Sequence, residues 1–286
     1  MGESELFAKR DRLVAILAEL PGVAVAFSGG IDSTVVAKAA ALALGSRAIA
    51  VTADSPSVPR SELATAREVA AIIGIRHVVI VTEEFDNPDY LKNDGDRCYH
   101  CKSELYSRIE MLLPELGVPV MASGANLDDL GDYRPGLTAA AEHHVRHPLQ
   151  EAGFTKADVR ALAFHWGLPT WDKPAAPCLS SRLAPGLAVT PERTGRVEEA
   201  EAWLRDLGLR ECRVRYHEGD LARIEVPLSE VAKLAEEPVR TGLAREFRRL
   251  GFKFVTLDLE GFRSGSLNEL VSLELKSRYE AAGARS

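Results

Sequence analysis

One short stretch near the N-terminus constrains the fold more than any other: Ser28-Gly29-Gly30-Ile31-Asp32-Ser33-Thr34. The apolar run 23–27 before it is typical of a buried parallel strand, and the run 35–44 after it, rich in alanine and leucine, favours a helix. The stretch is therefore predicted to be a strand-to-helix turn at the start of an α/β sheet. Such a turn presents free backbone N–H groups and the positive end of a helix dipole, which together suit phosphate.

The residue types in this turn also suit a phosphate ligand. Gly29 and Gly30 let the backbone approach closely because neither carries a Cβ, and Asp32 could hold Mg²⁺ on the phosphate oxygens. The hydroxyl donors of the turn are Ser28, Ser33 and Thr34. No Gly-Lys-Ser/Thr follows the glycines, which excludes the P-loop pattern. The alternative is a glycine-rich turn in which Asp32 or Ser33 only caps the helix.

Size and charge limit the class of protein. The chain has 286 residues, of which 46% are apolar, enough for one large domain or two small ones. Its net charge of −7 argues against nucleic acid as the main partner. No run of 18 apolar residues occurs, so no membrane association is expected. The acidic N-terminus lacks the apolar core of a signal peptide, and we expect a cytoplasmic protein.

Strands and helices alternate in the first part of the chain. Strands are predicted at 23–27, 47–53, 76–82 and 118–123, and helices at 5–20, 35–44, 59–73 and 102–113. The alternation indicates a parallel, doubly wound sheet, in which ligands lie beyond the carboxyl ends of the strands. Ala53 and the loop that starts at Gly124 follow such ends. The carboxylates of that loop, 124–129, either bind metal or a nucleotide or form a solvated acidic turn.

The four cysteines point to chemistry, because they are too few for a disulfide framework in a chain this long. Cys98 and Cys101 form a Cys-X-X-Cys pair before the helix predicted at 102–113. Such a pair is a redox couple, half of a zinc site, two ligands of an iron–sulfur cluster, or a chance arrangement. Cys178 lies in a proline-rich segment, 171–182, that is predicted to be rigid and non-helical.

A domain boundary is predicted beside Cys178, giving domains 1–176 and 177–286. The second is predicted to be a smaller α+β domain with helices at 191–207, 227–237 and 239–250 and strands at 211–217, 221–226 and 252–257. In the first of these strands, Cys212 shares a buried face with its apolar neighbours, whereas Arg213 and Arg215 project from the other face. Paired arginines suit a substrate phosphate, and the alternative is a solvated strand face.

The turn resembles the PP-loop of the N-type ATP pyrophosphatases, Ser-Gly-Gly-X-Asp-Ser. That loop grips the β- and γ-phosphates of ATP and leaves the α-phosphate open to attack. Together with further segments, it resembles the LarE family over nearly the whole chain. The matching segments are 124–129, 132–136, 172–182, 213–217 and 222–225. LarE proteins are ATP-dependent sulfur transferases that build the nickel-pincer nucleotide of lactate racemase.

The resemblance implies a reaction and a set of site residues. A carboxylate of a pyridinium biscarboxylate mononucleotide is adenylated, and sulfur then displaces AMP to give a thiocarboxylate. Arg213 and Arg215 would hold the phosphate of this small-molecule substrate, and Glu201 and Glu225 would bind a second metal. The implied ATP and Mg²⁺ site comprises Ser28, Gly29, Gly30, Asp32, Ser33, Thr34, Ala53 and Gly124. Members of the family tend to form trimers or hexamers, so a homo-oligomer is expected.

The resemblance leaves two sources of sulfur. Members with three cysteines hold a 4Fe-4S cluster that carries an extra sulfide, and Cys98, Cys101 and Cys178 match that set. Members with one cysteine give up its sulfur and end as dehydroalanine, and Cys178 matches that residue. The competing functions are tRNA thiolation by a cluster-bearing PP-loop enzyme, amide formation by a PP-loop ligase, and nucleotide binding by a zinc-stapled module.

Overall fold

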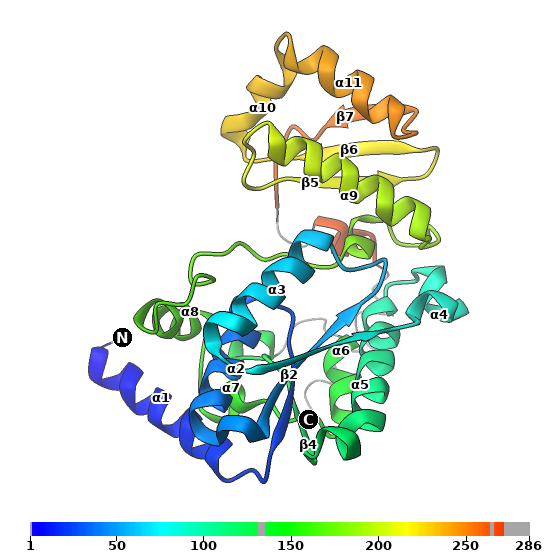
Figure 1. Ribbon diagram of the computed structural model, residues 1–286. Helices are drawn as coiled ribbons and strands as arrows, with labels where there is room; N and C mark the ends of the chain where they lie inside the picture. Colours follow the sequence, from blue (N-terminus) through cyan, green and yellow to red (C-terminus); the bar gives the residue numbers. More distant parts are fainter. Residues whose placement is uncertain (1, 131–134, 264–265, 272–286) are drawn as a thin grey trace. The chain divides into compact units, whose positions relative to one another are not determined.

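The computed structural model describes residues 2–130, 135–263 and 266–271 (Figure 1). The chain divides into two compact units, which are described separately. The first contains 2–84, 98–130 and 135–176, and the second contains 85–97, 177–263 and 266–271. Residues 132–134, part of a segment that carries the family resemblance, lie outside the described residues. Along the described chain, no helix combines the length and the apolar character needed to cross a membrane.

The first unit is built on a parallel sheet with the strand order β3-β2-β1-β4. The strands are β1 (Val23–Ala26), β2 (Ala48–Asp54), β3 (Arg76–Val81) and β4 (Val120–Ala122). The helices are α1 (Glu3–Ala18), α2 (Ile31–Leu44), α3 (Arg60–Ile73), α5 (Arg97–Leu116), α6 (Pro135–Glu142), α7 (Pro148–Glu151) and α8 (Lys156–His165). Short 3₁₀ turns are η1 (Gly45–Arg47) and η3 (Leu127–Asp129); η2 (Glu84–Asp86) begins in this unit at Glu84, and its other two residues belong to the second unit. β2 and β3 are added on one side of β1, and β4 is added on its other side. The topological switch point therefore lies at the carboxyl ends of β1 and β4.

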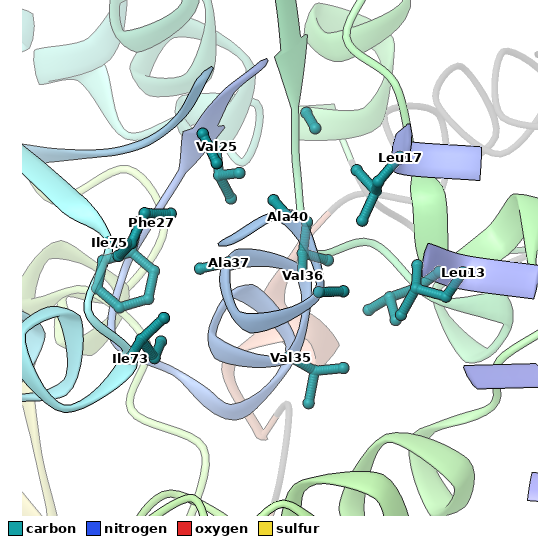
Figure 2. Packing of buried hydrophobic residues seen from close by; sticks show 14 of the residues in the cluster. Leu13, Leu17, Val25, Phe27, Val35, Val36, Ala37, Ala40, Ile73 and Ile75 are labelled. Carbon is teal, nitrogen blue, oxygen red and sulfur yellow. The ribbon is translucent and has the colours of Figure 1, made fainter. Parts of the chain in front are cut away.

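Helices cover both faces of this sheet. On one face, Val25 and Phe27 belong to one apolar cluster with α2 and α1; in Figure 2, Phe27 lies beside Ile73 and Ile75, and Leu13 and Leu17 of α1 lie on the other side of α2. The other face packs against α5 and α6; the α5 side chains in that cluster include Leu105, Tyr106 and Ile109. β1 is buried on both faces because both sets of its alternating side chains are apolar. The predicted parallel, doubly wound α/β fold is confirmed.

The second unit contains a small mixed sheet with the order β5-β6-β7, as expected for an α+β region. Its strands are β5 (Arg213–His217), β6 (Leu221–Glu225) and β7 (Phe254–Leu257). Its helices are α4 (Pro88–Lys92), α9 (Pro191–Asp206), α10 (Leu228–Ala235) and α11 (Val239–Arg249), with the 3₁₀ turns η4 (Leu179–Arg182) and η5 (Ser266–Leu270). β5 and β6 are antiparallel and are joined by a turn that contains Gly219 and Asp220, and β7 runs parallel to β6.

Two local predictions were wrong. The polar, turn-rich sequence of 83–97 predicts an irregular loop, but this stretch forms η2 and α4, because Asn87 caps a helix that begins at Pro88. Helix α5 begins at Arg97 rather than after the cysteine pair, so Cys98 and Cys101 lie in its first turns.

β5 was expected to be half-buried, yet four of its five residues are buried. One face packs against α9 and buries Val214, whereas the other is covered by residues that are distant in sequence. On this second face, Ser266 Oγ donates a hydrogen bond to Glu225 of β6. The Phe262 ring lies against the guanidinium group of Arg213. Alternation along the strand could not reveal this second cover, because it comes from a separate segment.

Candidate nucleotide site and arginine cluster

The turn 28–34 connects the carboxyl end of β1 to the N-terminus of α2, for which Gly30 is the N-cap residue. Gly29 has a positive φ of 68°, and a Cβ added there would lie 2.9 Å from the Cα of Ala66 in α3. Both the backbone conformation and the close approach of α3 therefore require glycine at this position. The N-terminal N–H groups of α2 and its dipole face the same point, a geometry that suits an anion.

The hydroxyls of the turn largely hold the turn itself together. Ser33 Oγ donates to the Gly30 carbonyl at 3.1 Å, and Thr34 Oγ1 donates to the same carbonyl at 2.8 Å. Both side chains are buried. Ser28 is exposed, and its Oγ accepts the Gly30 N–H at 3.2 Å. Of the three hydroxyls named from the sequence, that of Ser28 lies at the surface, and those of Ser33 and Thr34 fix the backbone that would meet a phosphate.

The loop after β4 packs directly against this turn at the switch point. A Cβ on Gly124 would lie 2.7 Å from the backbone nitrogen of Ser33, so no side chain fits there. Asn126 Nδ2 donates to Asp32 Oδ1 at 3.1 Å. The carboxylates of Asp128 and Asp129 accept backbone N–H groups, from Lys156 and Asn126 respectively, each at 2.9 Å. They brace the loop, so their geometry favours a structural role.

Two lysines that the sequence analysis did not single out reach the turn. Lys156, the first residue of α8, places its Nζ 2.5 Å from Asp32 Oδ2. Lys173 Nζ lies 2.7 Å from Glu62 Oε2 and 3.4 Å from the Gly29 carbonyl oxygen. Both lysines are distant in sequence from the residues that they contact: Lys156 is 124 positions from Asp32, and Lys173 is 144 positions from Gly29. They bring positive charge to the turn. Lys173 lies in the segment 172–182 that carries the family resemblance, but nothing in the sequence pairs either lysine with the turn, because the contacts exist only through the packing of α8 and the following loop.

An open cavity of about 390 Å³ lies beyond the carboxyl ends of β2 and β3. Its lining residues are Asp54, Ser55, Pro56, Arg60, Val81 and Thr82. Half-buried Ala53, the predicted adenine contact, precedes the first of them in β2. Behind the cavity, the buried Glu84 accepts hydrogen bonds from Ser55 and Ser57 at 2.6 and 2.9 Å, an arrangement that the sequence did not suggest.

The cysteines lie in three different environments. Cys98 is exposed and Cys101 is half-buried, and their i, i+3 spacing places both on one face of α5. Cys178 is half-buried at the start of η4 in the second unit, where its carbonyl accepts from Ser181 Oγ at 2.7 Å. Cys212 is buried, as expected, and burial raises the pKa of its thiol to about 11. The two accessible thiols of α5 fit a metal cluster, whereas the Cys212 thiol does not.

Metal-binding groups were sought among the residues that the structure describes. Nowhere in 2–130, 135–263 or 266–271 do three His, Cys, Asp or Glu side chains gather so that they could hold a metal ion. The predicted ligand set is divided between the units, with Cys98 and Cys101 in the first and Cys178 in the second.

Buried arginines and glutamates form a second cluster, in the second unit. Arg215 donates to Glu225 Oε2 through Nε at 2.9 Å and through Nη2 at 2.8 Å. Arg182 contacts both oxygens of Glu201, donating to Oε1 through Nε at 2.9 Å and to Oε2 through Nη2 at 3.2 Å. These two carboxylates, implied by the family to bind a second metal, are engaged by guanidinium groups instead.

Arg213 completes the cluster. Its Nη1 donates to the Cys212 carbonyl at 2.7 Å, and its guanidinium lies 5.0 Å from the centre of the Phe262 ring. Burial, followed by the nearby Arg182 guanidinium, lowers the pKa of Arg213. The structure therefore brings the two predicted phosphate-binding arginines together with a third, Arg182, whose Nη1 also holds the Cys178 carbonyl at 3.0 Å. Arg182 and Arg215 are paired with Glu201 and Glu225, yet both still act on Arg213, and an anion beside Arg213 would offset their repulsion.

Comparison with known proteins gives several matches. The asparagine synthase family model matches residues 17–93, which include the turn and β2. The chain is 40% identical, over 93% of its length and 96% of the relative, to pyridinium-3,5-bisthiocarboxylic acid mononucleotide synthase of Lactiplantibacillus plantarum. An uncharacterized protein of Synechocystis is 45% identical over 93% of this chain and 99% of the relative. The tRNA-specific 2-thiouridylase MnmA of Azorhizobium caulinodans is 32% identical over only 53% of this chain and 48% of the relative.

Proposed function

This chain belongs to the LarE family and is a sulfurtransferase that adenylates its substrate, and from that premise we propose that it acts on pyridinium-3,5-biscarboxylic acid mononucleotide. The product would be the corresponding thiocarboxylate, made for a nickel-pincer cofactor. The observation that carries the proposal is the 40% identity to the Lactiplantibacillus plantarum synthase along 93% of this chain. The match to MnmA spans only about half of either protein and supports tRNA thiolation less well.

The first step of the proposed reaction takes place at the turn 28–34. The N–H groups of this turn and of α2 would bind the β- and γ-phosphates of ATP, and Asp32 would hold Mg²⁺ on the phosphate oxygens. A substrate carboxylate oxygen then attacks the α-phosphorus, and pyrophosphate leaves with the electron pair of the broken P–O bond. Adenylation makes the carboxyl carbon reactive, because AMP is a far better leaving group than oxide.

The second step requires the substrate to be held and a sulfur atom to be delivered. The arginines of the second unit, Arg213 and Arg215, would bind the substrate phosphate through charge-assisted hydrogen bonds. A 4Fe-4S cluster held by Cys98, Cys101 and Cys178 would supply the sulfide, because three thiolates leave one iron open. The alternative donor is Cys178 itself, which would end as dehydroalanine.

Anaerobic preparation tests the sulfur source. If the cluster is the donor, the protein contains about four iron and four sulfide ions per chain, and Cys98→Ala abolishes thiocarboxylate formation. Cys212→Ser is the matched control, because this buried thiol should have no part in the transfer. Full activity of Cys98→Ala, with loss of the Cys178 sulfur in its mass spectrum, would establish the sacrificial route instead. A protein that contains stoichiometric zinc and does not release pyrophosphate from ATP would contradict the proposed reaction and favour a zinc-stapled nucleotide-binding module.

A further inference from the structure

The two lysines beside the turn have no role in the chemistry described so far. Lys156 and Lys173 come from opposite ends of the segment formed by α8 and the loop after it, yet both ammonium groups reach the turn. Lys156 meets the carboxylate of Asp32, in the first turn of α2. Lys173 meets Glu62, in the first turn of α3, and the carbonyl of Gly29. Two cations therefore lie beside the turn, one at Asp32 and one at the Gly29 carbonyl.

We propose that Lys156 and Lys173 bind the β- and γ-phosphates of ATP and stabilise the pyrophosphate as it leaves. This inference rests on the proposed function, because it assigns residues to the nucleotide site of that reaction. Asp32 and Glu62 hold the two ammonium groups beside the turn, and a polyphosphate takes their place as the partner. The exchange leaves the carboxylate of Asp32 available to Mg²⁺.

The exposure of the groups is consistent with such an exchange. The Lys156 side chain is 36% exposed and that of Asp32 is 25% exposed, so the pair lies at the surface of the turn. Ion pairs with this exposure contribute little to stability, and they are easily broken when a more highly charged anion arrives. Lys173 and Glu62 are 19% and 20% exposed, so water reaches this pair as well, although less than it reaches the first.

The position of the lysines also suits the chemistry of the leaving group. When the bond between the α-phosphorus and its bridging oxygen breaks, the electron pair stays on pyrophosphate, while the substrate oxygen forms the new bond. Negative charge therefore develops on the group that the turn holds. Ammonium groups placed there beforehand stabilise this charge without reorganising water.

Titration calorimetry of the full-length protein with ATP and Mg²⁺, with inorganic pyrophosphate and with AMP tests the proposal. Lys156→Ala and Lys173→Ala should each weaken binding of ATP and of pyrophosphate roughly ten- to hundredfold, because each removes one charge-assisted hydrogen bond. Binding of AMP should change less than about twofold, since AMP lacks the phosphates concerned. Lys38→Ala is the matched control: it removes one positive charge from α2, about two turns beyond its start, and should bind all three ligands as the wild type does.

Further variants separate phosphate binding from a merely structural role. If Lys156 acts only by holding Asp32, then Lys156→Ala has no further effect in an Asp32→Asn background. We expect it still to weaken pyrophosphate binding there. Glu62→Gln should tighten pyrophosphate binding, because Lys173 no longer has to leave a carboxylate. That gain should shrink in the Lys173→Ala background.

The outcomes also distinguish this inference from the proposed function. Lysine variants that bind ATP and pyrophosphate like the wild type, or that lose AMP to the same extent as ATP, would overturn the inference alone. A wild-type protein that binds neither ATP nor pyrophosphate would overturn the proposed function itself.

Discussion

Gly124 allows a close test of the candidate nucleotide site, because its lack of a side chain lets the loop after β4 pack directly against the first turn of α2. A Cβ at this position would lie 2.7 Å from the Ser33 nitrogen and 2.9 Å from the Asp32 carbonyl carbon, whereas ordinary contacts begin at 3.4 Å. Both atoms belong to backbone in the first turn of α2, so neither can yield by a side-chain rotation. In Gly124→Ala, the loop and the helix must separate by about 0.7 Å.

This displacement should affect both stability and nucleotide binding. Forcing a methyl group into a packed site costs about 1–3 kcal/mol, which urea denaturation measures. Because the shift moves the N–H groups that would face the phosphates in the proposed ATP site, we expect roughly a hundredfold loss in kcat/KM for pyrophosphate release. Wild-type stability and pyrophosphate release in this variant would refute the packing of the loop against α2.

Gly195→Ala is the matched control for the chemical change. Gly195 lies inside α9, and nothing is within 4 Å of the position that its Cβ would occupy. Here alanine should stabilise the helix by about 0.5–1 kcal/mol, because glycine loses more backbone entropy on folding. Pyrophosphate release should be unchanged.

Three further predictions concern the second unit. Cys212 in the native protein should resist alkylation by iodoacetamide at pH 8, because a pKa of about 11 leaves roughly one thiol in a thousand ionised. Rapid alkylation of Cys212, measured by peptide mass spectrometry, would contradict its burial. Arg215→Met should destabilise the protein by about 3 kcal/mol in urea denaturation, because it removes a partner of the fully buried Glu225 carboxylate. Adding Glu225→Leu should restore much of the lost stability, and no recovery would show that burial of this charge is not the cause. The hydrogen bond from Lys253 lowers the pKa of Asp220 from 3.8 to about 2, so the Asp220 carboxylate stabilises the fold fully above pH 4 and loses this effect as the pH falls through 2. The difference in thermal midpoint between wild type and Asp220→Asn should therefore shrink from pH 4 to pH 2, and a constant difference would exclude the linkage.

The family and the main elements of the fold could be predicted because their signals are local. The turn 28–34 carries its own glycines and is flanked by an apolar strand and a helix-forming run, and the structure has a strand, a turn and a helix there. The N-cap of α8 was also recognisable, since Thr155 and Asp158 form a capping box within four residues. Cys212 was correctly assigned to a buried face from alternation alone.

The start of α5 shows the limit of local reasoning. The prediction placed Cys98 before the helix, because the polar run around it has no apolar periodicity. In the structure, the helix extends back to Arg97, so the spacing of Cys98 and Cys101 becomes one helical turn. Their position relative to each other thus depends on where the helix begins, and weak periodicity does not determine that residue.

By itself, the sequence determined most of the strands and helices, the place of the glycine-rich turn 28–34, and the family to which the chain belongs. These properties depend on residues that are neighbours in the chain. Only the tertiary structure decided that Lys156 and Lys173 flank that turn and that Glu225 and Glu201 are occupied by arginines. Such contacts join residues brought together by packing, and the charges of a chain do not reveal their partners until the backbone has fixed the distances between them.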